Sequence, residues 1–138
     1  MGIANFSSRL CYTFFMKFRQ FLNRWLPVIF WCGLIFLFSS IPTVQTSKIY
    51  WWDFVLKKTA HVIEYAVLFF LTFRAVTPTN KKSLITNYSL LITFIFCLLY
   101  AITDEYHQSF VPGRHCKAMD IGFDSLGMLI SFWRIKIG

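Results

Sequence analysis

Ten side chains that could do acid–base chemistry or bind a polar ligand are concentrated in three short segments of a strongly apolar chain. They are Lys58, His61, Glu64, Tyr65, Asp104, Glu105, Gln108, Arg114, Asp120 and Asp124. Residues three, four and seven apart share one face of an α-helix, so the first four are expected to form a polar stripe within two turns. The same spacing places Asp104 beside Gln108, and Asp120 beside Asp124. Pro112 and Gly113 predict a turn just before Arg114, so its guanidinium is expected to fold back over the helix ends and to pair with at least one of the five acids there, Glu64, Asp104, Glu105, Asp120 or Asp124.

Three interpretations of this polar set stay open at the level of the sequence. Carboxylates buried beside Lys, Arg and His are stable only as paired, hydrogen-bonded groups, which favours a structural network that joins helix ends. Ionisable residues inside membrane spans also mark functional sites by default, which favours a pocket for a charged headgroup or polymer end. Proton movement is the third interpretation.

Catalysis is less well supported by the residue pattern. His61 could act as a general base, and Arg114 with Lys58 could hold a phosphate. However, no Ser or Cys nucleophile has an evident place beside them, and Ser39, Ser40 and Ser109 are unsupported candidates. A metal site built from His61, Glu64 and the acids is conceivable, but we expect neither a metal nor another cofactor. The four cysteines form no CxxC pair, so they imply neither a disulfide scaffold nor a zinc module.

Composition shows what kind of elements must position these side chains. Hydrophobic residues make up 57% of the 138 residues and aromatic residues 20%, whereas charged residues make up only 14%. Soluble domains carry about 25% charged residues, so most of this chain is expected to lie in lipid. The net charge of +8 is then explained by cationic loops at a membrane rather than by nucleic-acid binding. We expect no cleavable signal, because 24 residues precede the first long uncharged run.

The runs between charged residues predict an all-α integral membrane bundle of four transmembrane helices with an N-terminal interfacial helix. The predicted spans are Trp25–Ile41, Thr59–Phe73, Ser83–Thr103 and Ala118–Trp133. Residues 1–24 form a basic, aromatic cytoplasmic arm, residues 25–134 the transmembrane domain, and residues 135–138 a short cytoplasmic tail. The second and fourth spans are short and begin with polar residues, as expected of helix ends that face protein rather than lipid.

The distribution of charge predicts the orientation of these spans. Nine Lys and Arg residues fall on the side of the two termini and five on the other side, so the positive-inside rule places both termini in the cytoplasm. All six acids and all three histidines fall on the opposite side, in outer loops or in the outer halves of the second and fourth spans. Chemistry or recognition is therefore expected at the outer face.

The polar segments resemble a known family of small membrane proteins. Lys58-x-x-His61-x-x-Glu64-Tyr65, the block from Asp104-Glu105-x-x-Gln108 to Pro112-Gly113-Arg114, and Asp120-x-x-x-Asp124-x-x-Gly127 are together similar to the VanZ-like family. Ser39-Ser40-Ile41-Pro42 adds to the resemblance, which covers most of 25–131 and leaves residues 1–24 outside. Position 124 often carries Asn in the family and carries Asp124 in this chain.

The resemblance implies a bacterial cytoplasmic-membrane protein, and the family's founding member is associated with teicoplanin resistance. The expected function is an outward-facing polar site that binds an envelope lipid or cell-wall precursor and is linked to glycopeptide resistance. The alternative is a membrane-embedded enzyme that acts on a lipid phosphate or peptidoglycan-related substrate. A transporter ranks third among the expected functions. Four short helices leave little room for a transport pathway unless the protein forms an oligomer.

Overall fold

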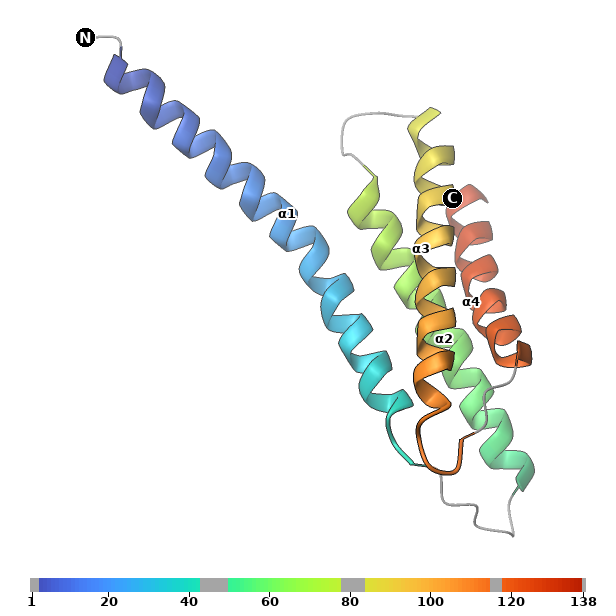
Figure 1. The fold of residues 1–138 in the computed structure, drawn as a ribbon. Helices are drawn as coiled ribbons and strands as arrows, with labels where there is room; N and C mark the ends of the chain where they lie inside the picture. Colours follow the sequence, from blue (N-terminus) through green and yellow to red (C-terminus); the bar gives the residue numbers. More distant parts are fainter. Residues whose placement is uncertain (1–2, 43–49, 78–83, 115–117, 138) are drawn as a thin grey trace.

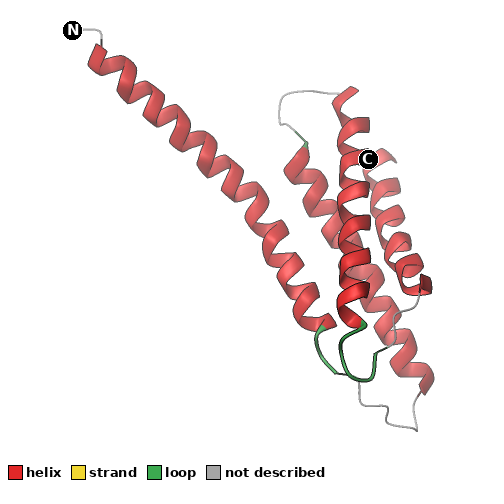
Figure 2. Cartoon of the chain, viewed as in Figure 1, coloured by secondary structure: helices red, strands yellow, loops and turns green. Residues whose placement is uncertain are grey.

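The computed structural model describes residues 3–42, 50–77, 84–114 and 118–137, and within them the chain forms four helices (Figure 1). The helices are α1 (Ile3–Ser39), α2 (Tyr50–Val76), α3 (Leu84–Gln108) and α4 (Ala118–Ile137). Within these residues there is no β-strand (Figure 2). The predicted all-helical fold is confirmed.

Three of the four helices are long and apolar enough to cross a membrane. The stretches that qualify are Tyr12–Ser39 of α1, Val55–Val76 of α2 and Asn87–Gln108 of α3. They overlap the first three predicted spans. Each helix is longer than its predicted span, although α1 ends two residues before Ile41 and α3 begins one residue after Ser83. The α4 helix forms as predicted but does not qualify as a membrane span. Its 20 residues include four charged ones, Asp120, Asp124, Arg134 and Lys136. A fourth membrane crossing therefore stays a prediction.

The N-terminal part of the chain differs from the sequence-based expectation of a separate interfacial helix. The α1 helix runs without a break through 37 residues, and it leans away from the other helices toward its N-terminal part (Figure 1). No Gly or Pro lies between Phe6 and Leu26, so nothing in the sequence ends the helix before the predicted span begins. Pro27 lies within α1 and removes one backbone donor without ending it. At 1.5 Å per residue α1 is about 55 Å long, well beyond the ~30 Å hydrocarbon core.

The α2 helix holds the bundle together and packs most extensively against α4. Gly127 of α4 lies directly on the α2 backbone, because a Cβ added there would come within 2.2 Å of the Val62 carbonyl oxygen. One turn further on, the Ser131 hydroxyl donates a 2.7 Å hydrogen bond to the Ala66 carbonyl of α2. Small residues at such spacing allow close approach of helices in membranes. Buried apolar residues from all four helices, among them Tyr65, Phe69, Cys97 and Met128, form the core.

Chain direction brings the polar segments to one end of this bundle. The C-terminal end of α1, the first half of α2, the C-terminal end of α3 and the first half of α4 lie together there, whereas the first turns of α1 and the last turns of α4 lie toward the opposite end (Figure 1). We call the end of the bundle that holds these polar segments the polar end. At the opposite end Arg24 of α1 donates a 3.0 Å hydrogen bond to the Thr77 carbonyl after α2.

Candidate functional site

Two polar pairs join α2 to α4 at the polar end. Lys58 of α2 forms an ion pair with Asp120 of α4. One turn deeper, Nδ1 of His61 lies 3.1 Å from Oδ1 of Asp124, whose side chain is almost fully buried. The spacing of three residues on α2 thus matches the spacing of four on α4, and the two helices are connected by successive pairs.

A second set of contacts holds the loop after α3. The Pro112–Gly113 turn forms as predicted, with Gly113 at a φ of 80° and the Arg114 amide donating to the Val111 carbonyl at 3.1 Å. This left-handed conformation suits glycine at the third position of a type II turn. Nη1 of Arg114 donates to Oε1 of Gln108 at 2.9 Å, and Nε2 of Gln108 donates to Oδ2 of Asp104 at 2.8 Å.

Within the residues that the structure describes, Arg114 pairs with no acid, although the sequence suggested that it would. Its other donors reach the carbonyl oxygens of Phe38 at 3.0 Å and Ile41 at 3.3 Å, where α1 ends. The last carbonyls of a helix have no partner within the helix, so a planar guanidinium near them satisfies several at once. Arg114 therefore ties the α3–α4 loop to α1 and reaches Asp104 only through Gln108.

Three polar side-chain groups at the polar end have no hydrogen-bond partner among the described residues. Tyr65 Oη and Asp104 Oδ1 are buried and have no hydrogen-bond partner there. The Glu64 carboxylate forms neither an ion pair nor a hydrogen bond within the described part of the chain, and only its backbone carbonyl is bonded, by the Trp31 indole at 2.9 Å. His61, Asp104, Asp124 and Arg114 are the charged groups close enough to act on Glu64 electrostatically. Glu105 is also buried at this end.

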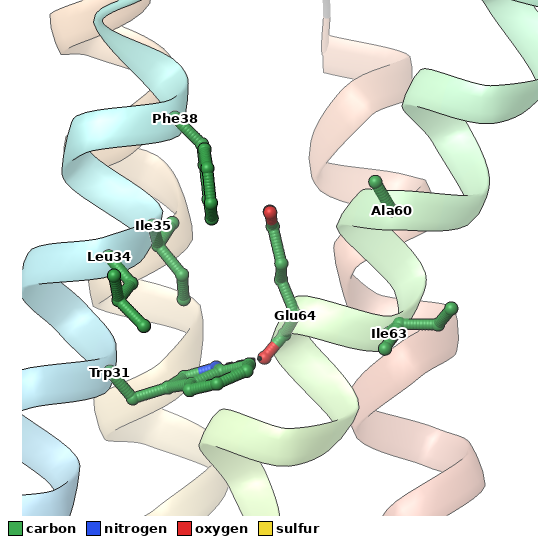
Figure 3. A pocket seen from close by; sticks show the side chains of 7 residues that line it. All are labelled: Trp31, Leu34, Ile35, Phe38, Ala60, Ile63 and Glu64. Atoms are coloured by element: carbon green, nitrogen blue, oxygen red, sulfur yellow. Dashed lines mark hydrogen bonds between the residues drawn. The ribbon is translucent and has the colours of Figure 1, made fainter.

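Glu64 projects into a cavity between α1 and α2. The cavity measures about 270 Å³, and Figure 3 shows the Glu64 side chain extending from α2 into the space between the helices. The remaining lining is apolar or aromatic and consists of Trp31, Leu34, Ile35, Phe38, Ala60 and Ile63. The sequence contained no signal for this cavity, because it depends on how α1 leans on α2.

One serine–histidine contact was not predicted from the sequence. Ser40 Oγ lies 3.0 Å from Nε2 of His107, and the His107 ring lies on the Phe36 ring with centroids 4.3 Å apart. However, the Ser40 hydroxyl donates its only proton to the Phe36 carbonyl at 2.6 Å, so His107 must be the donor in the contact with Ser40. This geometry caps the end of α1 and does not activate a nucleophile. Ser39 likewise bonds the Phe36 carbonyl, at 3.1 Å, and Ser109 bonds the Tyr106 carbonyl at 2.6 Å.

The polar end carries more negative than positive groups. Among the ten candidates, five carboxyl groups face two permanently charged cations, Lys58 and Arg114, together with His61. Within the residues that the structure describes, no group of three or more His, Cys, Asp or Glu is arranged to hold a metal ion. The three residues before α4 lie outside the described part of the chain; they are His115, Cys116 and Lys117.

Comparison with known proteins identifies the family. A model of the VanZ/LLP1 family matches residues 10–137, nearly the whole chain. The chain belongs to the VanZ/LLP1 family. The match begins within the N-terminal arm, so the family's sequence pattern extends further toward the N-terminus than the polar motifs alone indicated. No curated protein and no solved structure matches the chain. Family membership and three membrane-span-like helices together make this a VanZ-like multi-pass membrane protein.

Proposed function

We propose that this VanZ/LLP1-family protein lies in the bacterial cytoplasmic membrane with both termini in the cytoplasm and its polar end facing outward. There it binds an envelope lipid or lipid-linked cell-wall precursor. The orientation is supported by the nine-to-five distribution of Lys and Arg and by the position of every acid on the side with fewer cations. The fourth crossing, by α4, brings the C-terminus back to the side of the N-terminus.

The observation that carries the binding proposal is the set of unmatched polar groups at the polar end. A network that served only to join helices is expected to pair its buried members, since unpaired buried groups are rare in native proteins. Here Tyr65 Oη and Asp104 Oδ1 are buried without a partner among the described residues, and Glu64 faces a cavity. These groups have hydrogen-bonding capacity that a ligand's polar headgroup can use.

Tyr65→Phe separates binding from scaffolding. The substitution removes a buried hydroxyl that has no protein partner among the described residues, so the free energy of unfolding should stay the same or rise. If the hydroxyl contacts a headgroup, fewer lipid molecules should remain bound to the purified full-length protein in native mass spectrometry. Tyr88→Phe is the matched control, because Tyr88 is 69% exposed. Unchanged lipid retention in Tyr65→Phe, or no retained lipid in the wild type, contradicts the proposal.

The proposed link to teicoplanin resistance follows from the family and from the outward position of the site. Binding of a surface component would change how a glycopeptide reaches its target. Cells that express the wild-type protein should therefore tolerate more teicoplanin than cells that express an equal amount of Tyr65→Phe. Equal sensitivity of both strains and of a strain without the protein would contradict this link.

The alternative, an enzyme acting on a lipid phosphate or peptidoglycan-related substrate, has one contact in its favour, that between His61 and Asp124, in which a carboxylate lies beside an imidazole that could act as a general base. The purified protein is then expected to turn over lipid-linked substrates, and His61→Ala should abolish turnover while the protein stays folded. Absence of turnover in the wild type excludes this alternative for the substrates tested.

A further inference from the structure

The cavity between α1 and α2 combines an apolar wall with a single carboxylate. Its length along α1, from Trp31 to Phe38, covers eight residues, and the seven rises between them amount to about 10 Å. Trp31 is held in place by the hydrogen bond from its indole to the Glu64 carbonyl, so one aromatic wall and the carboxylate are fixed relative to each other. Both helices qualify as membrane spans, so the cavity opens between two elements that face lipid.

An anionic group does not suit this cavity. None of its lining residues is a cation. Arg114 is engaged with Gln108 and with the carbonyls of Phe38 and Ile41 at the end of α1 and just after it, and Lys58 is paired with Asp120. A phosphate placed beside Glu64 would meet a like charge in a region of low dielectric, where repulsion is strong.

We infer that the cavity binds the primary ammonium group of an amine-bearing membrane lipid, with Glu64 as the ion-pairing acceptor. A carboxylate in an apolar environment is stabilised by a cation that also donates hydrogen bonds, and ammonium supplies three donors. Trp31 and Phe38 favour the same ligand, because aromatic faces attract ammonium groups. The volume of about 270 Å³ lies below that of most drug-sized sites, so it fits a small headgroup and the first carbons behind it rather than a whole lipid.

The inference rests on the proposed function, since it names the headgroup chemistry of the ligand. It also accounts for the different environments of the carboxylates. Asp120, Asp124 and Asp104 each bond a protein side chain, whereas Glu64 bonds none among the described residues and is directed into the cavity (Figure 3).

The test offers the purified full-length protein an equal mixture of phosphatidylethanolamine, phosphatidylcholine and phosphatidylglycerol and counts retained lipids by native mass spectrometry. The wild type should retain phosphatidylethanolamine at least tenfold over the other two, which corresponds to about 1.4 kcal/mol. Glu64→Gln keeps the shape and removes the charge, and it should abolish this preference. Asp120→Asn removes the same charge outside the cavity lining and should preserve it.

Each outcome distinguishes this inference from the proposed function. Lipid retention without preference for the primary amine, or a preference unchanged in Glu64→Gln, overturns the inference and leaves lipid binding intact. If no lipid is retained, the proposed function fails as well. A second arm compares dodecylamine with dodecanol by the rise in melting temperature. Stabilisation by dodecylamine alone, without retained lipid, would assign the cavity to free amphiphilic amines and overturn the lipid inference.

Discussion

Gly127→Ala is expected to destabilise the bundle by forcing α4 away from α2. The added Cβ would lie 2.2 Å from the Val62 carbonyl oxygen and 3.1 Å from the Ala66 amide nitrogen. Carbon–oxygen contacts between packed helices are about 3.3–3.6 Å, so α4 must move outward by roughly 1 Å. Overpacking of this kind costs about 1–3 kcal/mol. The movement also stretches the 2.7 Å hydrogen bond from Ser131 to Ala66, whose loss costs about 0.5–1.5 kcal/mol.

A favourable contribution opposes these costs, because Ala is a better helix former than Gly by about 1 kcal/mol. The net expectation is a loss of about 1–3 kcal/mol in the free energy of unfolding. Gly122→Ala is the matched control, since nothing lies within 4 Å of a Cβ at that position of the same helix and the change should be neutral or stabilising. Thermal unfolding in detergent, followed by circular dichroism, measures both variants. If they unfold at the same temperature, α2 and α4 do not approach as closely as described.

Three further outcomes test the polar end and its orientation. Arg114→Ala should lower the melting temperature in detergent, and Arg114→Lys should restore only part of the loss, because an ammonium cannot bond Gln108 and the Phe38 and Ile41 carbonyls in the same planar arrangement. Equal stability of both variants would contradict this. In a double-mutant cycle of His61→Ala and Asp124→Ala, the unfolding free energies should show a coupling of about 0.5–3 kcal/mol, and additive effects would mean that the pair does not form. A membrane-impermeant thiol reagent should label Cys116 but not Cys11 in cells with a permeabilised outer barrier, and labelling of Cys11 alone would reverse the orientation.

The sequence was sufficient to predict the helical elements and the region where polar residues gather. A long run without charged residues is enough to predict a membrane-spanning helix, because length and hydropathy are the only requirements. Three of the four predicted spans are confirmed as long and apolar enough to cross a membrane. The predicted fourth span, which contains Asp120, is not confirmed as a membrane crossing, because the four charged residues within α4 lower its hydropathy. Gly113 was predictable since Pro followed by Gly strongly favours one turn geometry, and its φ of 80° agrees.

Contacts between helices were not predictable to the same degree. Arg114 was expected to bond a carboxylate because the Pro–Gly turn brings its planar guanidinium back over the helix ends, where five acids lie. The acceptors it reaches are the carbonyl of Phe38, in the last turn of α1, and that of Ile41, just after the helix. The last carbonyls of any helix lack a partner within it whatever the sequence, so charge complementarity does not reveal such acceptors. Gly127 was part of the recognised motif, yet its role as the point of closest approach depends on the distance between α2 and α4.

The polar stripe on α2 shows why spacing alone could not separate scaffold from site. Each residue of an α-helix advances by about 100°, so a step of three residues falls about 60° short of a full turn. Two such steps, from Lys58 through His61 to Glu64, rotate the side-chain direction by about 120° in total. The first two residues therefore face α4, where Asp120 and Asp124 pair with them, while Glu64 has turned toward α1 and the cavity. One stripe of evenly spaced residues thus both joins α2 to α4 and presents a carboxylate that no side chain of α4 binds within the described residues.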